Sequence, residues 1–393
     1  MIKTRYLKSA VAADLKNKMV FIGGPRQVGK TTMALSIGKE GYKNFSYLNW
    51  DSREDRKAIL EGRFRGDTTL VIFDEIHKYR QWKTYLKGEF DKYKDKFHIL
   101  VTGSARLDLY RKGGDSLMGR YHYYRLHPFS LTEGLGIESS IKAGEELVFP
   151  EVAPARLKKV FEQLFAFGGF PEPFLAQDNK TLRRFHNERA DRLVRGDIRD
   201  LEQVRDLSAL QILVEILPEK VGSLLSLNAL REDLNVAHKT ISSWVDILER
   251  FYYHFRVYPF AFKTIKSLRR EPKMYLWDWS QITDSAVRLE NLTGSHLLKT
   301  VHFLFDALGY KAELFFLRDI DGREVDFLIT IDKKPWFAVE VKLTDEQISP
   351  ALKYFQQKLK IPYVYQVIGA SGLDYWQNSI RLISADKFLT ALV

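Results

Sequence analysis

Apolar runs alternate with amphipathic segments along the first third of the chain. MVFIGG followed by TTMALSIGKEG predicts a short buried strand and then a helix that Gly41 closes. The runs TLVIF and FHILVTG have the length and β-branched content of buried parallel strands, with helical segments between them. This alternation predicts βαβ units and a covered parallel sheet, so we expect residues 1–150 to form an α/β domain.

The pattern changes after Pro150. Helical periodicity extends from Ala155 to about Ala209 and is interrupted by the loop FGGFPEP. A second helical block follows and ends in the aromatic run FYYHFRVYPFAF. The charged connector KTIKSLRREPK comes after it. From about Ser285 a long helix, three strands (AELFFL, REVDFLITI, WFAVEVKL), a helix (SPALKYFQQKLK) and a strand (YVYQVIG) are expected. The predicted segments are therefore a helical lid at 151–205, a second helical domain with its connector at 206–275 and an α/β domain at 276–393.

Composition narrows the class of protein. The 393 residues are 45% hydrophobic and 28% charged and contain no cysteine, which excludes disulfides, thiolate metal sites and a cysteine nucleophile. No signal peptide is visible and no apolar run approaches the ~18 residues of a membrane span, so a cytoplasmic protein without a membrane partner is expected. The net charge of +11 favours polyanions, nucleic acid first, although a solvated basic surface would give the same charge.

The strongest motif is GxxxxGK[ST], placed between a predicted strand and a predicted helix. Its residues, with the threonine that follows, are Gly24, Pro25, Arg26, Gln27, Val28, Gly29, Lys30, Thr31 and Thr32. The glycines let the backbone N–H groups face phosphate oxygens, Lys30 would contact the β- and γ-phosphates, and the Thr31 hydroxyl would ligate Mg²⁺. The motif predicts a nucleotide cofactor.

A second motif, LVIFDE, ends a predicted strand with two carboxylates. Asp74 would complete the Mg²⁺ shell, and Glu75 would orient or activate the attacking water. The strand HILVTGSAR ends at Ser104, which would sense the γ-phosphate or that water. No guanine-reading NKxD-type motif is visible, so ATP with Mg²⁺ is preferred over GTP.

These residues resemble a subgroup of prokaryotic AAA+ ATPases. The shared motifs are RYL, GPRQVGKTT, YLNWD, DEI, TGSAR, LMGR, HPFSLTE, FGGFPEPFL and RGDIRDL, between about Ile2 and Leu201. The resemblance implies an arginine finger acting on a neighbouring subunit of a homo-oligomer; Arg120 is the first candidate and Arg106 the second. It also implies that Pro171 contacts the adenine, although a plain turn would explain the GGFP sequence as well.

The middle block predicts a helix-turn-helix of winged-helix type. Its apolar positions suit two helices separated by NVAH: Leu227, Leu230, Leu234, Ile241, Trp244, Val245 and Leu248. The aromatic run that follows would be the wing hairpin. DNA contacts would come from the start of the second helix and from the connector: His238, Lys239, Thr240, Ser243, Lys263, Lys266, Arg269, Arg270 and Lys273. A lid or a protein interface is the alternative use of this domain.

The C-terminal segment contains a second set of charged residues. Alternation along a strand places Glu340 and Lys342 on one face, and a turn would bring Asp326 beside Glu340 and the Val341 carbonyl. Asp326 and Glu340 would ligate Mg²⁺, while Lys342 would stabilise charge or lower the pKa of the attacking water. Glu290, on the preceding helix, would support the metal or its water.

The order E…D…ExK across helix and hairpin resembles the restriction-endonuclease-like PD-(D/E)xK superfamily. That resemblance implies either a nuclease or a DNA-binding platform that does not cleave. We therefore expect an ATP-hydrolysing machine that acts on DNA, with possible Mg²⁺-dependent cleavage. The rival interpretation is a nucleotide-dependent signalling or scaffold switch with protein partners and a non-catalytic C-terminal domain.

Overall fold

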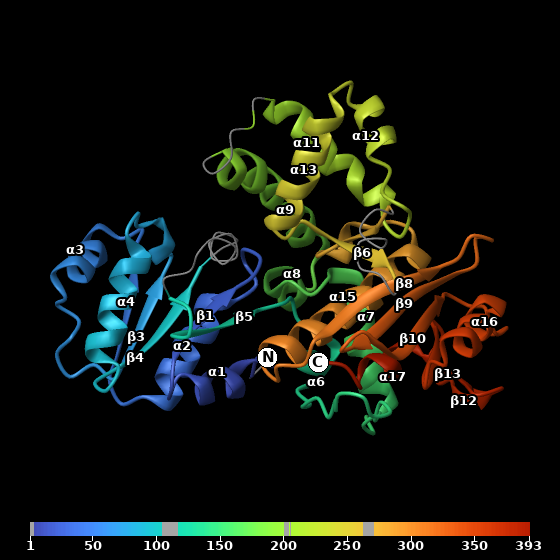
Figure 1. Cartoon of the computed structure of the whole chain (residues 1–393), viewed down its shortest axis with the longest axis horizontal. Coiled ribbons are helices and arrows are strands. Elements are labelled where there is room, and N and C mark those ends of the chain that lie inside the picture. The colour runs from blue at the N-terminus through green and yellow to red at the C-terminus, as the bar shows by residue number, and fades with distance from the viewer. Residues whose placement is uncertain (1–3, 104–116, 200–203, 205, 262–270) are drawn as a thin grey trace. The chain divides into compact units, whose positions relative to one another are not determined.

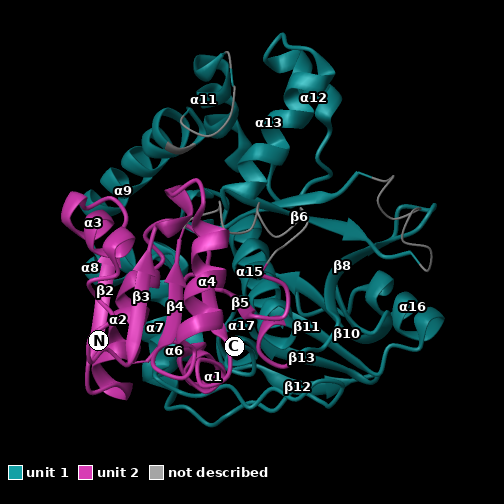
Figure 2. Cartoon of the chain, turned by 60° about the vertical axis from the view of Figure 1, so that its left-hand side comes forward, with its two compact units in different colours: residues 1–2, 129–305, 309–393 teal, residues 3–128, 306–308 magenta. Residues whose placement is uncertain are grey.

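The computed structural model describes residues 4–103, 117–199, 204, 206–261 and 271–393. The chain divides into two compact units (Figure 2). The P-loop unit comprises residues 3–128 with 306–308, and the C-terminal unit comprises 129–305 and 309–393. Within the described ranges, no helix combines the length and apolarity that crossing a membrane requires.

The P-loop unit contains a five-stranded parallel sheet in the order β2-β3-β4-β1-β5. Its strands are β1 (Met19–Gly23), β2 (Phe45–Asn49), β3 (Leu70–Asp74), β4 (His98–Thr102) and β5 (Tyr121–Arg125). Its helices are α1 (Lys8–Asp14), α2 (Lys30–Gly41), α3 (Arg53–Glu61), the short η1 (Ile76–Lys78) and α4 (Trp82–Tyr93) (Figure 1). Every residue of β1 and β3 is buried, as both faces of a covered sheet require. The predicted α/β class with a parallel sheet is therefore confirmed, although this unit ends at residue 128.

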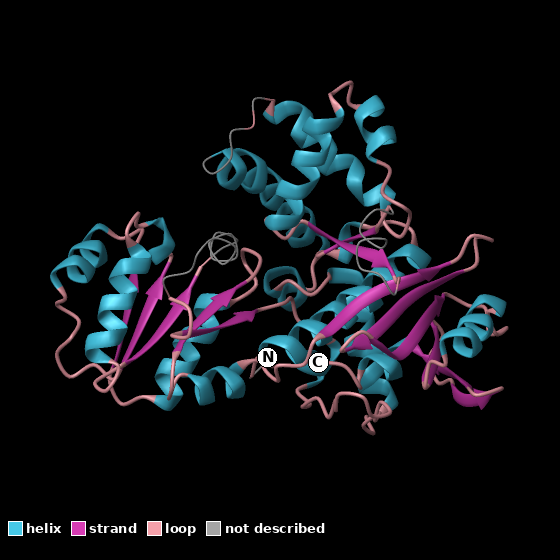
Figure 3. Cartoon of the chain, in the orientation of Figure 1, coloured by secondary structure: helices cyan, strands magenta, loops and turns pink. Residues whose placement is uncertain are grey.

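The C-terminal unit begins with a series of helices. They are α6 (Leu131–Leu135), α7 (Pro154–Phe167), α8 (Pro171–Ala176), α9 (Asn179–Asp191), the π-helical η2 (Arg192–Ile198), α11 (Leu207–Ile216) and η3 (Leu217–Lys220) (Figure 3). Local signals set several of the starts. Pro154 and Pro171 lie in the first turns of α7 and α8, where proline loses no helical hydrogen bond, and the Asp178 carboxylate caps α9.

The middle block contains α12 (Leu227–Asp233), α13 (His238–Arg250) and the antiparallel pair β6 (His254–Pro259) and β7 (Lys273–Leu276). The two helices lie where the sequence predicts them. The aromatic run, however, forms one strand rather than a complete hairpin, because no turn residue divides it and its partner β7 lies beyond the connector. Lys263, Lys266, Arg269 and Arg270 lie outside the described residues.

An eight-stranded sheet follows in the order β12-β13-β11-β10-β9-β8-β6-β7. Its further strands are β8 (Ala312–Arg318), β9 (Glu324–Ile331), β10 (Lys334–Lys342), β11 (Tyr363–Ile368), β12 (Asp374–Gln377) and β13 (Ile380–Ser384). The helices of this segment are η4 (Trp279–Gln281), α15 (Ser285–Asp306), α16 (Pro350–Leu359) and α17 (Ala385–Leu389). Strand β6 pairs in parallel with β8, so the hairpin of the middle block is part of the same sheet.

Two local features position the elements around β9. Asp332 and Lys333 have φ angles of 49° and 65° and connect β9 to β10 as a two-residue hairpin turn. Gly294 allows α15 to approach β9, because a Cβ there would lie 2.8 Å from the ring of Phe327. The helix and both strands of the predicted carboxylate site are thereby held together.

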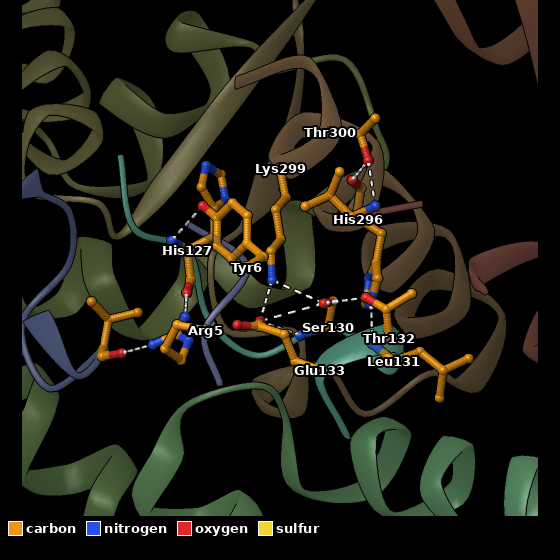
Figure 4. Close-up of polar contacts among 12 residues, drawn as sticks. Arg5, Tyr6, His127, Ser130, Leu131, Thr132, Glu133, His296, Lys299 and Thr300 are labelled. Carbon is orange, nitrogen blue, oxygen red and sulfur yellow. Dashed lines mark hydrogen bonds and ion pairs between the residues drawn. The ribbon is translucent and has the colours of Figure 1, made fainter. Parts of the chain in front are cut away.

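A buried polar network within the C-terminal unit links α6 to α15 (Figure 4). Ser130 and Glu133 form a capping box at the start of α6, and the Lys299 ammonium contacts both of their side chains. His296 Nε2 accepts the Leu131 N–H at 3.1 Å, which leaves Nδ1 to donate to the Leu292 carbonyl. Burial lowers the pKa of His296 to about 3, so this imidazole is neutral in the folded state.

Acidification should therefore destabilise the fold partly through His296. Below the unfolded-state pKa of about 6.5 the unfolded chain binds a proton that the folded chain does not, which costs about 1.4 kcal/mol per pH unit until the folded pKa is reached. We expect His296→Gln to reduce the pH dependence of the urea-unfolding free energy between pH 6 and 4. His122→Gln, at an imidazole that is 43% exposed, controls for the loss of one histidine. An unchanged slope in His296→Gln would contradict the assignment.

Candidate functional site

The phosphate-binding loop curls between β1 and α2, and its geometry depends on two glycines. Gly24 has a φ of 135°, and a Cβ there would lie 2.4 Å from the Leu126 carbonyl oxygen, so a side chain does not fit. Gly29, with a φ of 95°, precedes the first turn of α2. The Lys30 ammonium is buried inside the loop and donates to the carbonyls of Gly24 (2.9 Å) and Pro25 (2.6 Å).

The remaining residues of the loop have distinct environments. Val28 is buried and anchors the loop, whereas Arg26 and Thr32 are exposed. Gln27 has a φ of 60°, so the crest of the loop contains a non-glycine residue in the left-handed region. The first N–H groups of α2 have no acceptor within the helix, which gives the loop an anion-binding character.

Asp74, at the end of β3, accepts hydrogen bonds from three hydroxyl groups. Thr31 Oγ1 and Tyr47 Oη donate to Oδ2 at 2.9 and 2.8 Å, and Thr102 Oγ1 donates to Oδ1 at 2.7 Å. All three donors are neutral, so the carboxylate is oriented without an ion pair. Hard oxygen ligands such as the Thr31 hydroxyl and the Asp74 carboxylate, side by side, fit Mg²⁺.

Glu75 follows Asp74 in a strained backbone conformation. Its φ of 56° lies in the left-handed region, and its N–H donates to the Thr102 carbonyl at 3.0 Å. Burial raises the pKa of Glu75, and the nearby Lys78 ammonium, 3.5 Å from Oε2, offsets part of that rise. A carboxylate with a raised pKa is a better proton acceptor, as activation of a water molecule requires.

The other predicted residues of this site have mixed outcomes. Ser104 and Arg106 lie outside the described residues. Arg120, just before β5, forms a two-pronged ion pair with Asp91 of α4 at 2.8 and 3.1 Å, and its side chain is 30% exposed. Pro171 is the first residue of α8 in the C-terminal unit. Their proposed roles stay predictions.

Two residues near the N-terminus have a role that the motif analysis missed. The Arg5 guanidinium donates to the carbonyls of Val28, in the phosphate-binding loop, and of His127 (Figure 4). Tyr6 donates to the Arg125 carbonyl and accepts the His127 N–H. The only sequence signal was the RYL tripeptide among the shared motifs, because spacing along the chain says nothing of a contact between residues 5 and 28.

The predicted carboxylates of the C-terminal segment lie close together. Lys342 Nζ is 2.8 Å from Glu340 Oε1 on the same face of β10. Asp326 Oδ2 accepts the N–H of Val341 at 2.9 Å, so its backbone partner is an amide rather than the expected carbonyl. Glu290, on α15, accepts the hydroxyl of Tyr275 at 2.7 Å. The helix, the two strands and the hairpin of the middle block all contribute to this cluster.

Lys273 is the main correction to the sequence analysis. Expected in an exposed basic connector, it is 3% exposed, because β7 pairs with β6 beside the C-terminal strands. Its ammonium lies 2.7 Å from Glu324 Oε1, 3.2 Å from Asp326 Oδ1 and 3.3 Å from Glu290 Oε1. Burial alone would lower the pKa of Lys273, but the three carboxylates outweigh burial and raise it.

The carboxylate cluster, defined as Glu290, Glu324, Asp326 and Glu340, also departs from the predicted metal site. Among the residues that the structure describes, no three Asp, Glu or His side chains are arranged to hold a metal ion. Burial, with the neighbouring Asp326 charge, raises the pKa of both Glu290 and Glu340 to about 7. The arrangement does not fit Asp326 and Glu340 as Mg²⁺ ligands.

Comparison with protein families divides the chain into three parts. Residues 16–135 match a family described as an AAA domain, which includes the phosphate-binding loop, Asp74 and Glu75. Residues 158–286 and 288–387 match two families described only as domains of unknown function. The match to an AAA domain covers most of the P-loop unit, while the families of the later segments carry no description of activity.

Whole-chain relatives are distant. The uncharacterized protein MJ1544 of Methanocaldococcus jannaschii is 23% identical over 363 residues, covering 88% of this chain and 80% of that protein. The uncharacterized protein Rv2008c of Mycobacterium tuberculosis is 22% identical over 95% of this chain and 81% of its own length. The RuvB Holliday junction branch migration motor of Thermotoga maritima aligns over 67% of this chain and 93% of that one, with 19% identity and a TM-score of 0.31. A score that low carries no conclusion about function.

Removal of the Arg5 guanidinium should loosen the phosphate-binding loop. Each hydrogen bond from a charged donor is worth about 1.5–3 kcal/mol, so we expect Arg5→Ala to raise the Kd for Mg·ATP by roughly tenfold or more. Arg53→Ala, at an exposed arginine of α3, is the matched control. Equilibrium titration with a fluorescent ATP analogue measures the effect, and equal Kd values for Arg5→Ala and Arg53→Ala would refute it.

Proposed function

We propose that this protein binds and hydrolyses ATP and uses the cycle to control binding of DNA by its C-terminal unit. The observation that carries the ATP part is the contact of Thr31 with Asp74 beside the lysine-containing loop. It joins the phosphate-binding loop to the end of β3, which is what a Mg·nucleotide site of the P-loop class requires.

The chemistry follows from the residues of the P-loop unit. Backbone N–H groups of the loop bind the phosphate oxygens. The Lys30 ammonium also binds them, and it gives up its contacts with the Gly24 and Pro25 carbonyls to do so. Thr31 and Asp74 would hold Mg²⁺, which when bound supplies positive charge to the β- and γ-phosphates. Glu75 accepts a proton from the water that attacks the γ-phosphorus. The bond between that phosphorus and the bridging oxygen breaks, and ADP leaves.

Arg120 is the proposed arginine finger for a neighbouring copy of the chain. Its ion pair with Asp91 lies within one subunit, so a subunit interface would have to exchange Asp91 for nucleotide. A partly exposed guanidinium paired with Asp91 is able to make that exchange at modest cost, since exposed ion pairs contribute little to stability. Ser104 is retained as the proposed phosphate sensor and Pro171 as the proposed adenine contact, both from the sequence alone.

The proposed DNA contact is the start of α13. Ile241, Trp244, Val245 and Leu248 form the buried face of this helix, and the predicted base-contacting residues lie off that face. Of these predicted base-contacting residues, three are exposed (His238, Lys239 and Ser243) and Thr240 is half-buried. A winged helix is supported by three helices (α11, α12 and α13), the bridge of Leu224 with Lys273 and the strand pair β6–β7. In a winged helix, the helix in the position of α13 enters the major groove.

We do not extend the proposal to DNA cleavage, because Lys273 contacts the carboxylates that would ligate the metal. The same observation favours the alternative partner, a protein. Lys273 and Lys342 are paired with carboxylates, so neither extends a basic stripe over the wing and connector. The alternative is therefore an ATP-dependent switch whose C-terminal unit recognises a protein.

Two substitutions separate ATP binding from hydrolysis. Lys30→Ala should weaken ATP binding and lower turnover by about 10²-fold, since one charged hydrogen-bond donor to phosphate is lost. Glu75→Gln should retain ATP binding and lower turnover by about 10²–10⁴-fold, as the loss of a general base does. Phosphate release and analogue binding report the two quantities, with the exposed Lys39→Ala of α2 as control. Wild-type turnover in Lys30→Ala would exclude this site.

DNA binding is tested by fluorescence anisotropy with duplex and single-stranded oligonucleotides over a salt series. The affinity of the wild type should fall as salt rises, and Lys239→Ala should reduce the slope of log K against log salt by about 1 if Lys239 contacts one phosphate. Lys180→Ala, at an exposed lysine of the same unit, is the matched control. No binding to either nucleic acid at low salt would reject DNA and favour the protein-partner alternative.

A further inference from the structure

The Lys273 ammonium is surrounded by carboxylate oxygens, as a bound metal cation would be. Each of the three carboxylate oxygens within 3.3 Å of its ammonium comes from a different residue: Glu324 and Asp326 on β9 and Glu290 on α15. An ammonium has three N–H donors, so its hydrogen-bonding capacity matches this set. The ring of Phe316, with its centroid 5.8 Å from the ammonium, lies nearby. The position is therefore a cation site filled by the chain itself.

The distances distinguish this arrangement from a metal shell. Carboxylate oxygens ligate Mg²⁺ at about 2.0–2.1 Å and Ca²⁺ at about 2.3–2.6 Å, with the ion between them. The oxygens around Lys273 lie 2.7–3.3 Å from nitrogen, which are hydrogen-bond distances. A divalent ion in contact with Asp326 and Glu290 would lie close to the ammonium, and the two positive charges would repel.

Lys273 is fixed by the backbone on both sides. It pairs with Val257 of β6 in the antiparallel ladder and with Leu224 in an isolated bridge. The ammonium therefore comes from the hairpin of the middle block, while the carboxylates come from the C-terminal α/β segment. A lysine on a paired strand is held in position far more firmly than one on a surface loop.

The fourth carboxylate shows that the cluster retains unused ligand capacity. Glu340 is 5% exposed; its Oε1 pairs with Lys342, and its buried Oε2 has no hydrogen-bond partner among the described residues. A buried acceptor without a partner costs free energy. This oxygen is an acceptor that neither the Lys273 nor the Lys342 ammonium uses.

We propose that Lys273 is the resident cation of the carboxylate cluster and keeps divalent metal out of it while β7 is paired with β6. In this arrangement the carboxylate cluster binds no divalent metal. Removal of the ammonium frees Glu290, Asp326 and Glu340 to close around a divalent cation. The inference is independent of ATP hydrolysis and of DNA binding, so the failure of either function leaves it untouched.

Mn²⁺ binding to the full-length protein without nucleotide tests the proposal. All samples carry Asp74→Asn, which removes the metal ligand of the P-loop unit, and free Mn²⁺ is measured by electron paramagnetic resonance. We expect no Mn²⁺ site that depends on Asp326 in this background. Adding Lys273→Met should create about one Mn²⁺ site per chain, and further addition of Asp326→Asn should abolish that site.

Lys342→Met is the matched control, because it removes the other lysine of the cluster without vacating the position among the three carboxylates. Equal Mn²⁺ binding by Lys342→Met and Lys273→Met would overturn the proposal, since charge alone would then explain the gain. An Asp326-dependent site already present with Lys273 intact would overturn it as well. If Lys273→Met is too unstable to titrate, Lys273→Gln is melted with and without Mn²⁺: a rise in Tm confined to this variant supports the proposal, and no rise refutes it.

Discussion

A buried ammonium must be surrounded by oxygen acceptors, and this constraint shapes three polar sites in the described part of the chain. Among the described residues, Lys30, Lys273 and Lys299 are the lysines with buried side chains. Lys30 contacts carbonyls of the phosphate-binding loop, Lys273 contacts carboxylates, and Lys299 contacts the capping box of α6. Lys273 and Lys299 connect segments that are distant along the chain, and removing one partner of a buried ion pair costs about 3–5 kcal/mol. Lys30 instead closes its own loop.

The acceptors differ in a way that separates the proposed roles. Around Lys30 they are backbone carbonyls, neutral dipoles that phosphate oxygens are able to replace. Around Lys299 and Lys273 they include carboxylates, so withdrawal of the lysine would leave buried negative charge. The first arrangement suits a ligand site, whereas the others suit permanent links between segments.

Much of the P-loop unit was predictable, because its central strands and its motif are continuous in sequence. Strand β2 was harder to predict: of FSYLN only Leu48 is buried, so the period of a buried strand is missing. The carboxylates Asp326 and Glu340 and the lysine Lys342 were also found, because strand alternation relates residues two apart. Lys273 was misplaced, since it follows a run of basic residues and its burial depends on the pairing of β6 with both β7 and β8. Long-range pairing of that kind leaves no local pattern.

The two acidic sites of the chain show why similar residues need not do similar chemistry. Asp74 is oriented by the hydroxyls of Thr31, Tyr47 and Thr102, and no ion pair to its carboxylate is seen among the described residues. Asp326 is oriented by a backbone N–H and by the Lys273 ammonium, so a fixed cation already balances it. A motif that names only the carboxylates describes both sites equally well. The residue that distinguishes them, Lys273, comes from another part of the chain.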